Sequence, residues 1–444
     1  MKLEHEIDFH WLILFALPTI FSSIFANLYT TVDGIFVAQW VNTDALSAIN
    51  ITLPMTYLAS ALGMMFGTGG NALVAKKLGE AREDFSLLMA VAFAFSVVLA
   101  FLCFLFLDPL CRFLGSDEAL LPYCRDYMVP VLVSIPFAVF GMVFQLSFIT
   151  VGRAGLGAAL SVIGGVLNIV LDWLFMAVFD WGLTGAAIAT SIGYAFPSLV
   201  GTVFFCVRRD LALYVVRPKW RPRTLLQSCA NGASEMVSVL AFSVVTILFN
   251  RILMDLGGSD GVASLTIIWY AQGLFGGLFR GYINGISSVV SYNLGKGDTA
   301  RLQRLFRISV RTLGVTALAV TAASYLFGGA VVDVFAKGNA HVAAVALRGF
   351  RIAAVSFVMM AYNIFASGWF TALNDGRTSA ILSFCRTIVF MVLPVLVLPR
   401  LWGMDGVWLS LAAGEILSIA MSLYYFRRFR PLWQPEMAAD QQKG

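Results

Sequence analysis

The amino-acid sequence predicts an all-α polytopic membrane protein with twelve transmembrane helices in two pseudo-symmetric six-helix bundles. Three observations lead to this fold class. Of the 444 residues, 59% are hydrophobic and only 12% are charged, whereas soluble domains average about 25% charged residues. Apolar runs of membrane-spanning length recur along the chain. Finally, sequence patterns in the second half repeat patterns of the first half.

The first apolar run, residues 11–37, is long enough to cross a bilayer, because about 20 helical residues at about 1.5 Å each cover a roughly 30 Å hydrocarbon core. It is too long for a cleavable signal peptide, so we expect it to be the first span. The later runs must also be helices, because a helix satisfies its own backbone in lipid. The predicted spans are 11–37, 46–73, 87–108, 127–149, 157–178, 184–207, 225–250, 262–292, 308–331, 347–373, 378–399 and 405–426.

Lysine and arginine residues are unevenly divided between the two sets of connecting segments. If the N-terminus is inside, the inner segments hold 21 of them and the outer segments hold 6, and three more lie inside spans. Basic residues favour cytoplasmic loops. The distribution therefore predicts an even number of spans with both termini cytoplasmic, in an inner or plasma membrane.

A basic segment at 208–224 divides the chain near its middle, and the halves on either side of it resemble each other. At an offset of 221 residues the matching pairs are Trp181 with Trp402, Gly182 with Gly403, Gly185 with Gly406 and Gly193 with Gly414. The predicted organisation is an N-terminal six-helix lobe at 1–207, a basic cytoplasmic linker at 208–224, a C-terminal six-helix lobe at 225–430 and a cytoplasmic tail at 431–444.

Two residues in the first span are costly in a lipid-facing helix. Asp33 places a carboxylate within the membrane, so it should face protein or a watery cavity. Pro18 removes a backbone hydrogen bond and kinks the helix. It is therefore a candidate helix hinge, the alternative being a proline that the helix merely tolerates. A kinked span with a lone acid is a candidate moving part that responds to a proton or a cation.

Four polar residues of the first half fall at similar depth in their spans. Asn168 and Asp172 are four residues apart and therefore share one helix face. With Asp33 and Thr190 they would supply two carboxylates, an amide and a hydroxyl. Such oxygen ligands suit a hard cation such as Na⁺, and two neighbouring acids can instead share a proton. The alternative is structural, because polar residues also join spanning helices to one another.

The repeat supplies an internal comparison for this cluster. The positions that correspond to Asp33, Asn168, Asp172 and Thr190 in the second half are Phe249, Val389, Leu393 and Leu411. The fold therefore does not require polar residues at these places, and only the first half has them.

Three sequence features are typical of one transporter family. They are T-V-D-G at 31–34, the segments K-K-L-G-E and S-Y-N-L-G-K-G-D at 76–80 and 291–298, and the segments T-V-G-R-A-G and T-A-L-N-D-G at 150–155 and 371–376. In their order, spacing and duplication they resemble the multidrug and toxic compound extrusion (MATE) family. The resemblance implies two six-helix lobes in a V around a central cavity, acting as a monomeric, cation-coupled exporter.

The resemblance also bears on the coupling site. It implies that an acidic cluster in the N-terminal lobe binds the coupling ion, and this sequence matches that pattern at all four polar positions. Other family members place coupling carboxylates midway along helices 7 and 10. Here Phe242 and Met360 occupy those places, so we do not expect a second ion site in the C-terminal lobe.

Other polar residues within the spans have less specific predictions. Arg386 and Glu415 lie at matching depth on neighbouring helices and are expected to form an ion pair. Glu235 either pairs with Arg280 in the same way or faces the cavity. Substrate contacts from Tyr29 and Gln145 complete the predicted set.

These features predict a secondary antiporter that exports organic, cationic amphipathic compounds by alternating access, driven by H⁺ or Na⁺. The alternative within transport is a flippase or an exporter for a lipid-linked or narrow endogenous substrate. An enzyme is not expected, because the chain shows no nucleophile–base or metal constellation. We expect no cofactor, no metal beyond a Na⁺ at the coupling site and no nucleic-acid partner, only small organic cations and the lipid bilayer.

Overall fold

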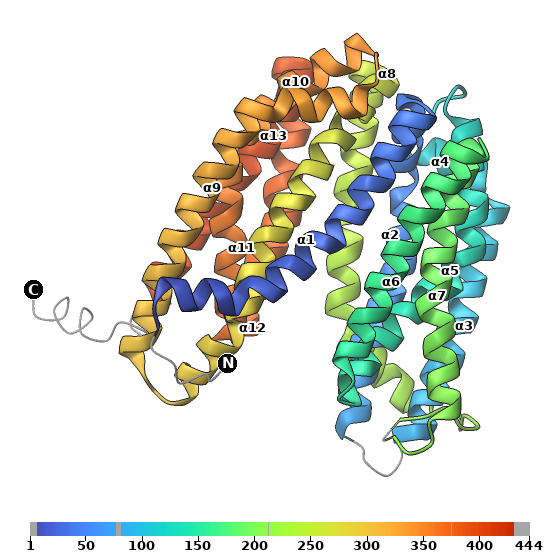
Figure 1. Ribbon diagram of the computed structural model, residues 1–444, viewed down its shortest axis with the longest axis vertical. Helices are drawn as coiled ribbons and strands as arrows, with labels where there is room; N and C mark the ends of the chain where they lie inside the picture. Colours follow the sequence, from blue (N-terminus) through green and yellow to red (C-terminus); the bar gives the residue numbers. More distant parts are fainter. Residues whose placement is uncertain (1–6, 77–80, 212, 374, 430–444) are drawn as a thin grey trace, which may run out of the picture. The chain divides into compact units, whose positions relative to one another are not determined.

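The computed structural model describes residues 7–76, 81–211, 213–373 and 375–429, and every regular element within them is helical. The elements, coloured along the chain in Figure 1, are α1 (Phe9–Trp40), α2 (Thr43–Lys76), α3 (Ala81–Leu105), α4 (Leu107–Leu114), α5 (Leu121–Thr150), α6 (Ala154–Asp172), the π-helix η1 (Trp173–Val178), α7 (Gly182–Val207), α8 (Pro222–Gly295), α9 (Thr299–Ala336), α10 (Ala340–Ala354), α11 (Phe357–Ala372), α12 (Gly376–Phe384), the π-helix η2 (Cys385–Val389) and α13 (Phe390–Phe429). The predicted tail at 431–444 lies outside the described residues.

The number of spans agrees with the sequence prediction. Nine described helical stretches are long and apolar enough to cross a membrane, and α10 with α11, bent by 54°, form a tenth. Two of the nine are interrupted by a glycine with non-helical backbone angles, Gly258 in α8 and Gly403 in α13. Each interrupted stretch consists of two helices joined at that glycine, which is consistent with the twelve spans predicted from the sequence.

The repeat is also visible in the backbone. Gly182 and Gly403, which the sequence alignment pairs, both have a φ of 56°, in the left-handed region that glycine adopts without penalty. Three residues later, Gly185 and Gly406 each lie so close to the preceding part of the chain that an added Cβ would press on it. The same turn and the same tight packing therefore begin the last helix of each half.

The chain forms two compact units. Unit 1 comprises Met1–Thr31 and Ser264–Gly444, and unit 2 comprises Val32–Ala263. These units group residues by packing, whereas the lobes predicted on either side of 208–224 are the two sequence repeats. The lobe boundaries therefore stay a prediction.

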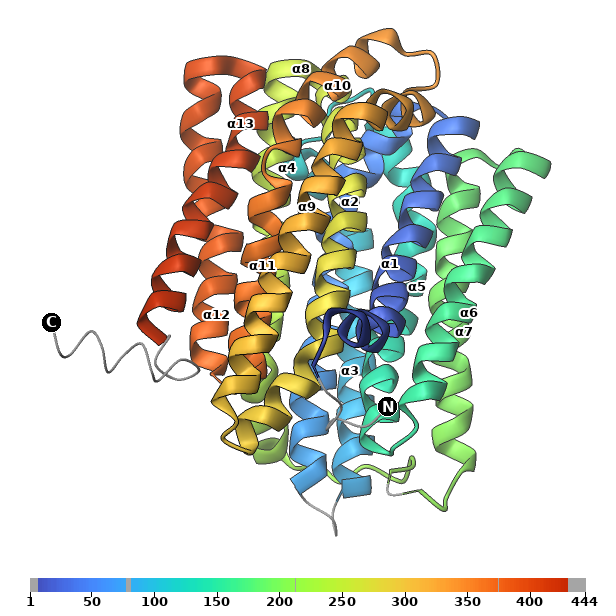
Figure 2. The same ribbon diagram turned by 60° about the vertical axis from the view of Figure 1, so that its left-hand side comes forward.

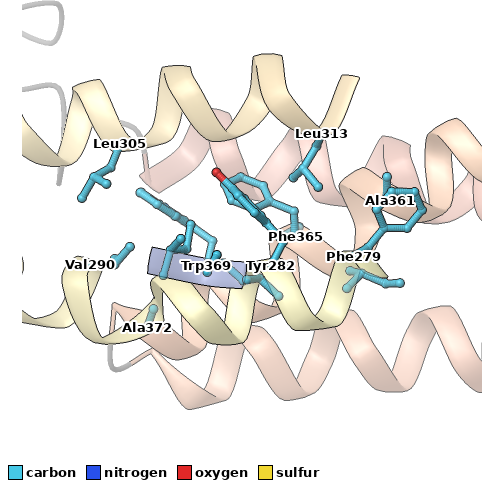
Figure 3. Packing of buried hydrophobic residues seen from close by; sticks show 14 of the residues in the cluster. Phe279, Tyr282, Val290, Leu305, Leu313, Ala361, Phe365, Trp369 and Ala372 are labelled. Atoms are coloured by element: carbon cyan, nitrogen blue, oxygen red, sulfur yellow. The ribbon is translucent and has the colours of Figure 1, made fainter. Parts of the chain in front are cut away.

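Unit 1 has its hydrophobic core between the part of α8 after Gly258 and the helices α9 and α11. Figure 3 shows Tyr282, Phe365 and Trp369 among the buried side chains of this cluster. Trp369 is fully buried. Helix α11 packs against α9, α12 and α13, and Figure 2 shows α9, α11 and α12 along one side of the unit.

The N-terminal part of α1 packs against the same part of α8 through glycines. A Cβ on Gly281 would lie 2.5 Å from the Cα of Ile20, and one on Gly285 would lie 2.8 Å from the Cα of Ala16. Such close backbone contact is typical of membrane helices, whose interfaces favour small residues. Because the glycines are four apart, they form one continuous face of α8.

Unit 2 is built around α5, which packs against α2, α3, α6 and α7. The predicted basic linker is bound to this unit at the start of α3. Arg221 forms ion pairs with Glu83 at 2.7 Å and with Asp84 at 3.2 Å. Lys219 also bonds to Glu83, at 2.6 Å. Two basic residues of the linker are therefore paired with the acidic first turn of α3.

Candidate functional site

The four polar residues predicted from sequence all lie in unit 2, on three helices. Asp33 is on α1, Asn168 and Asp172 are on α6, and Thr190 is on α7. Asp172 is fully buried, Asn168 and Asp33 are 4% and 8% exposed, and Thr190 is partly buried. Buried polar groups at membrane depth are costly and usually have a function or a partner.

Glycines allow α6 and α7 to approach closely at this point. A Cβ on Gly164 would lie 2.9 Å from the carbonyl oxygen of Gly193, and one on Gly193 would lie 3.2 Å from the Cβ of Asn168. The approach lets the amide Nδ2 of Asn168 donate to Oγ1 of Thr190 at 3.5 Å. This hydrogen bond is at the long end of the usual range, so it holds both groups loosely.

The two carboxyl groups lie close enough for the charge of one to act on the other. Both oxygens of Asp172 and Oδ1 of Asp33 are buried without a hydrogen-bond partner among the described residues. Two buried carboxylates without donors are strongly unfavourable when both are ionised. A proton or a cation between them would remove that cost.

The backbone changes its form directly after Asp172. Helix α6 ends there and continues as the π-helix η1. Single π-turns inside α-helices are rare and are frequent at functional sites.

The side chains present fit either a proton or Na⁺. The carboxylates of Asp33 and Asp172, the amide oxygen of Asn168 and the hydroxyl of Thr190 are the oxygen ligands that a hard cation prefers. Within the described part of the chain, no three His, Cys, Asp or Glu side chains gather as a site for a transition metal.

Unit 1 contains a different buried polar group. Nη2 of Arg386 donates to Oε1 of Glu415 at 2.5 Å, which confirms the predicted ion pair. Nδ2 of Asn363 donates to Oε2 of the same carboxylate at 2.6 Å. Oγ of Ser422 donates to Oδ1 of Asn363 at 2.9 Å. Sequence reasoning missed Asn363 and Ser422, although a lone asparagine in the apolar run of α11 was a signal.

The remaining predicted residues are dispersed. Pro18 lies inside α1, whose N-terminal part is visibly bent in Figure 1. Tyr29 is partly buried in unit 1, and Gln145 and Glu235 are exposed in unit 2. Arg280 belongs to unit 1 and Glu235 to unit 2, so their pairing stays a prediction, as do the substrate contacts.

Comparison with known proteins identifies the family. A family model described as MatE matches residues 18–174 and 236–396. The two matched ranges begin 218 residues apart, close to the offset found in the sequence. The chain belongs to the MatE family. It is therefore a multi-pass membrane transporter and not an enzyme.

This MatE transporter is similar over its whole length to known exporters. It is 23% identical over 439 residues to the multidrug export protein MepA of Staphylococcus saprophyticus, with 96% of each chain covered. It is also 23% identical to MepA of Staphylococcus aureus strain MRSA252, with 94% of this chain and 93% of the relative covered.

Solved structures show the same fold. A MATE family transporter of the MOP superfamily in its inward-facing conformation matches with a TM-score of 0.83 at 23% identity, covering 93% of this chain and 96% of the other. An outward-facing conformation matches with a TM-score of 0.70 at 23% identity, covering 95% and 96%. A MOP superfamily transporter from Pyrococcus furiosus matches with a TM-score of 0.71 at 22% identity, covering 95% of this chain and 96% of the other.

Proposed function

We propose that this MatE transporter exports organic, cationic amphipathic compounds by alternating access and that Asp33 and Asp172 couple export to inward movement of H⁺ or Na⁺. The observation that carries the proposal is the pair of buried carboxylates, three of whose four oxygens have no hydrogen-bond partner among the described residues. The similarity to multidrug export proteins over 96% of the chain supports the direction and the substrate class.

Coupling requires that the ion bind one conformation better than the other, since a ligand with equal affinity for both shifts nothing. Neutralising the Asp33–Asp172 pair removes the repulsion between two buried charges. The conformation in which the pair is buried is thereby stabilised only when the ion is bound. Asn168 and Thr190 add oxygen ligands beside the acids, and their weak mutual hydrogen bond leaves them able to turn towards a cation.

Helix α1 connects the coupling site to a hinge. Asp33 lies in the second half of the helix, and Pro18 lies in its bent N-terminal part. A proline leaves one backbone carbonyl without its helical hydrogen bond and thus lowers the cost of bending. In this proposal a change in packing around Asp33 is taken up as bending near Pro18. The protein works as a monomer in the inner or plasma membrane with both termini cytoplasmic.

Efflux of a fluorescent lipophilic cation from proteoliposomes tests the coupling site. Purified wild type, Asp33→Asn and Asp172→Asn are compared under an imposed H⁺ or Na⁺ gradient. Asp126→Asn is the matched control, because Asp126 is an exposed carboxylate outside the cluster. We expect wild type and the control to export the dye only with a gradient, and both cluster variants to lose gradient-driven export.

The two gradients separate the two ions. Export driven by a pH gradient in Na⁺-free buffer assigns the proton, and export driven only by a Na⁺ gradient assigns Na⁺. Gradient-driven export at the wild-type rate by both cluster variants would place coupling elsewhere and overturn the proposal. In that case Glu235 would be the next acid to test.

A further inference from the structure

The part of α8 after Gly258 carries a polar face in the middle of a membrane span. Arg280, Asn284 and Ser287 follow at spacings of four and three residues, so they share one side of the helix. Arg280 and Asn284 are exposed and Ser287 is partly buried. The opposite side, including Tyr282 and Val289, is buried in the core of unit 1.

The depth of this face excludes contact with lipid. Arg280 lies 15 residues before the end of α8 at Gly295, which is about 22 Å at 1.5 Å per residue. A guanidinium near the bilayer centre faces protein or a water-filled cavity, because lipid cannot solvate it. The exposed polar face of α8 is therefore turned towards water.

In the described part of the chain, no ion pair neutralises the charge of Arg280. Arg280 lies close enough to Arg386 for the two like charges to act on each other. Glu415 is already bonded by Arg386 and Asn363. Among the described residues Arg280 forms no ion pair with a carboxylate, so its positive charge stays uncompensated beside the Arg386–Glu415 pair.

Space for the Arg280 side chain is provided by a glycine one turn away. A Cβ on Gly276 would lie 3.2 Å from both terminal nitrogens of Arg280. The guanidinium thus lies against the backbone of Gly276, and part of it stays exposed. Arg386 uses its Nε and Nη2 for Glu415, which leaves its Nη1 for another acceptor.

We propose that Arg280, assisted by Arg386, binds an oxyanion of the transported compound: a carboxylate, sulfonate or phosphate. The planar guanidinium fork matches two oxygens of such a group. The inference rests on the proposed export function and refines its substrate class. The preferred compounds carry an oxyanion beside their positive charge and apolar body, and a water-facing arginine at mid-membrane depth is where that oxyanion is held.

A matched pair of dyes tests this site directly. Rhodamine B carries a free carboxylate beside its cationic xanthene, and its methyl ester lacks that negative charge. Binding of each dye to purified, detergent-solubilised protein is followed by fluorescence polarisation for wild type, Arg280→Gln and Arg280→Lys. Arg209→Gln serves as the control, because Arg209 is exposed outside the helices.

We expect Arg280→Gln to weaken binding of rhodamine B by roughly tenfold or more, the effect of losing a charge-assisted hydrogen bond. Binding of the ester should not change. Arg280→Lys keeps the positive charge but lacks the two parallel N–H donors of the guanidinium. Its affinity for rhodamine B should lie between the affinities of wild type and Arg280→Gln. An equal loss for both dyes would overturn the proposal, and so would unchanged binding of both dyes together with unchanged movement of a labelled phospholipid.

The same variants distinguish a soluble oxyanion from a lipid phosphate. In proteoliposomes containing fluorescently labelled phosphatidylglycerol, movement of the lipid between leaflets is measured by dithionite quenching. Movement that Arg280→Gln slows would support the oxyanion site and assign it to lipid. Because the dye titration needs no gradient, its result is independent of whether Asp33 and Asp172 couple transport.

Discussion

The two units each bury an acid at membrane depth, but they treat it differently. In unit 1 Glu415 is bonded by Arg386 and Asn363, and Ser422 holds the asparagine in turn. In unit 2 Asp172 is fully buried, and neither of its oxygens has a hydrogen-bond partner in the described part of the chain. Glu415 is paired within the protein, whereas under the proposed coupling Asp172 is paired only when an ion binds.

This difference separates a structural acid from a candidate functional one. Burying a charge costs several kcal/mol unless partners compensate. Glu415 has those partners permanently, so it stabilises one arrangement of helices. Asp172 and Asp33 would gain a partner only on binding, so their free energy changes with the conditions outside. Buried acids in membrane proteins are therefore better classified by their donors than by their depth.

The largest expected effect on stability comes from removing the arginine that pairs with Glu415. Arg386→Met leaves Glu415 as a buried charge with only an amide donor, and we expect the free energy of unfolding to fall by about 3–5 kcal/mol. Chemical denaturation of the detergent-solubilised protein measures it. The double variant Arg386→Met/Glu415→Leu should recover most of the loss, because it removes both charges. A double variant as unstable as the single one would contradict this account.

The same measurement on the two acids sharpens the comparison. Glu415→Gln weakens bonds to a charged partner and should lower the free energy of unfolding by about 1.5–3 kcal/mol. Asp172→Asn removes a buried charge that has no donor, so stability should stay within about 1 kcal/mol of wild type or rise. If Asp172→Asn destabilised the protein as much as Glu415→Gln, Asp172 would be a structural residue.

The smallest effects distinguish the neutral polar residues beside the acids. Ser422→Ala leaves Oδ1 of buried Asn363 without its donor, which should cost about 1–2 kcal/mol. Thr190→Val removes only the long contact of 3.5 Å with Asn168 and should cost less than about 0.5 kcal/mol. Equal losses in denaturation experiments would mean that the two sites are equally rigid.

The helices of this protein could be predicted well from the sequence, because each apolar run must form its own hydrogen bonds in lipid. The segments that connect the predicted spans are harder to predict from the sequence. Residues 109–114 and 340–346 lie between predicted spans, but they belong to the amphipathic helix α4 and to the first half of α10. These segments lie outside the long apolar runs, so hydrophobic length does not predict them.

The polar sites can likewise be predicted only in part from the sequence. Helical spacing was enough to place Asn168 and Asp172 on one face. Depth along the helix was enough to pair Arg386 with Glu415. The bond between Asn363 and Ser422 depends on how α11 and α13 are rotated against each other, and side-chain packing sets that rotation. The sequence of either helix alone does not determine this rotation.

The glycine face of α8 has a consequence for how the protein is made. Ala16 of α1 packs on Gly285 of α8, and the two residues are 269 positions apart in the chain. At a synthesis rate of about 5–20 residues per second, the first helix waits roughly 13–54 s for this partner. During that interval lipid or the insertion machinery must cover the surface of α1 that later contacts glycine, so α1 reaches its native packing long after its own synthesis.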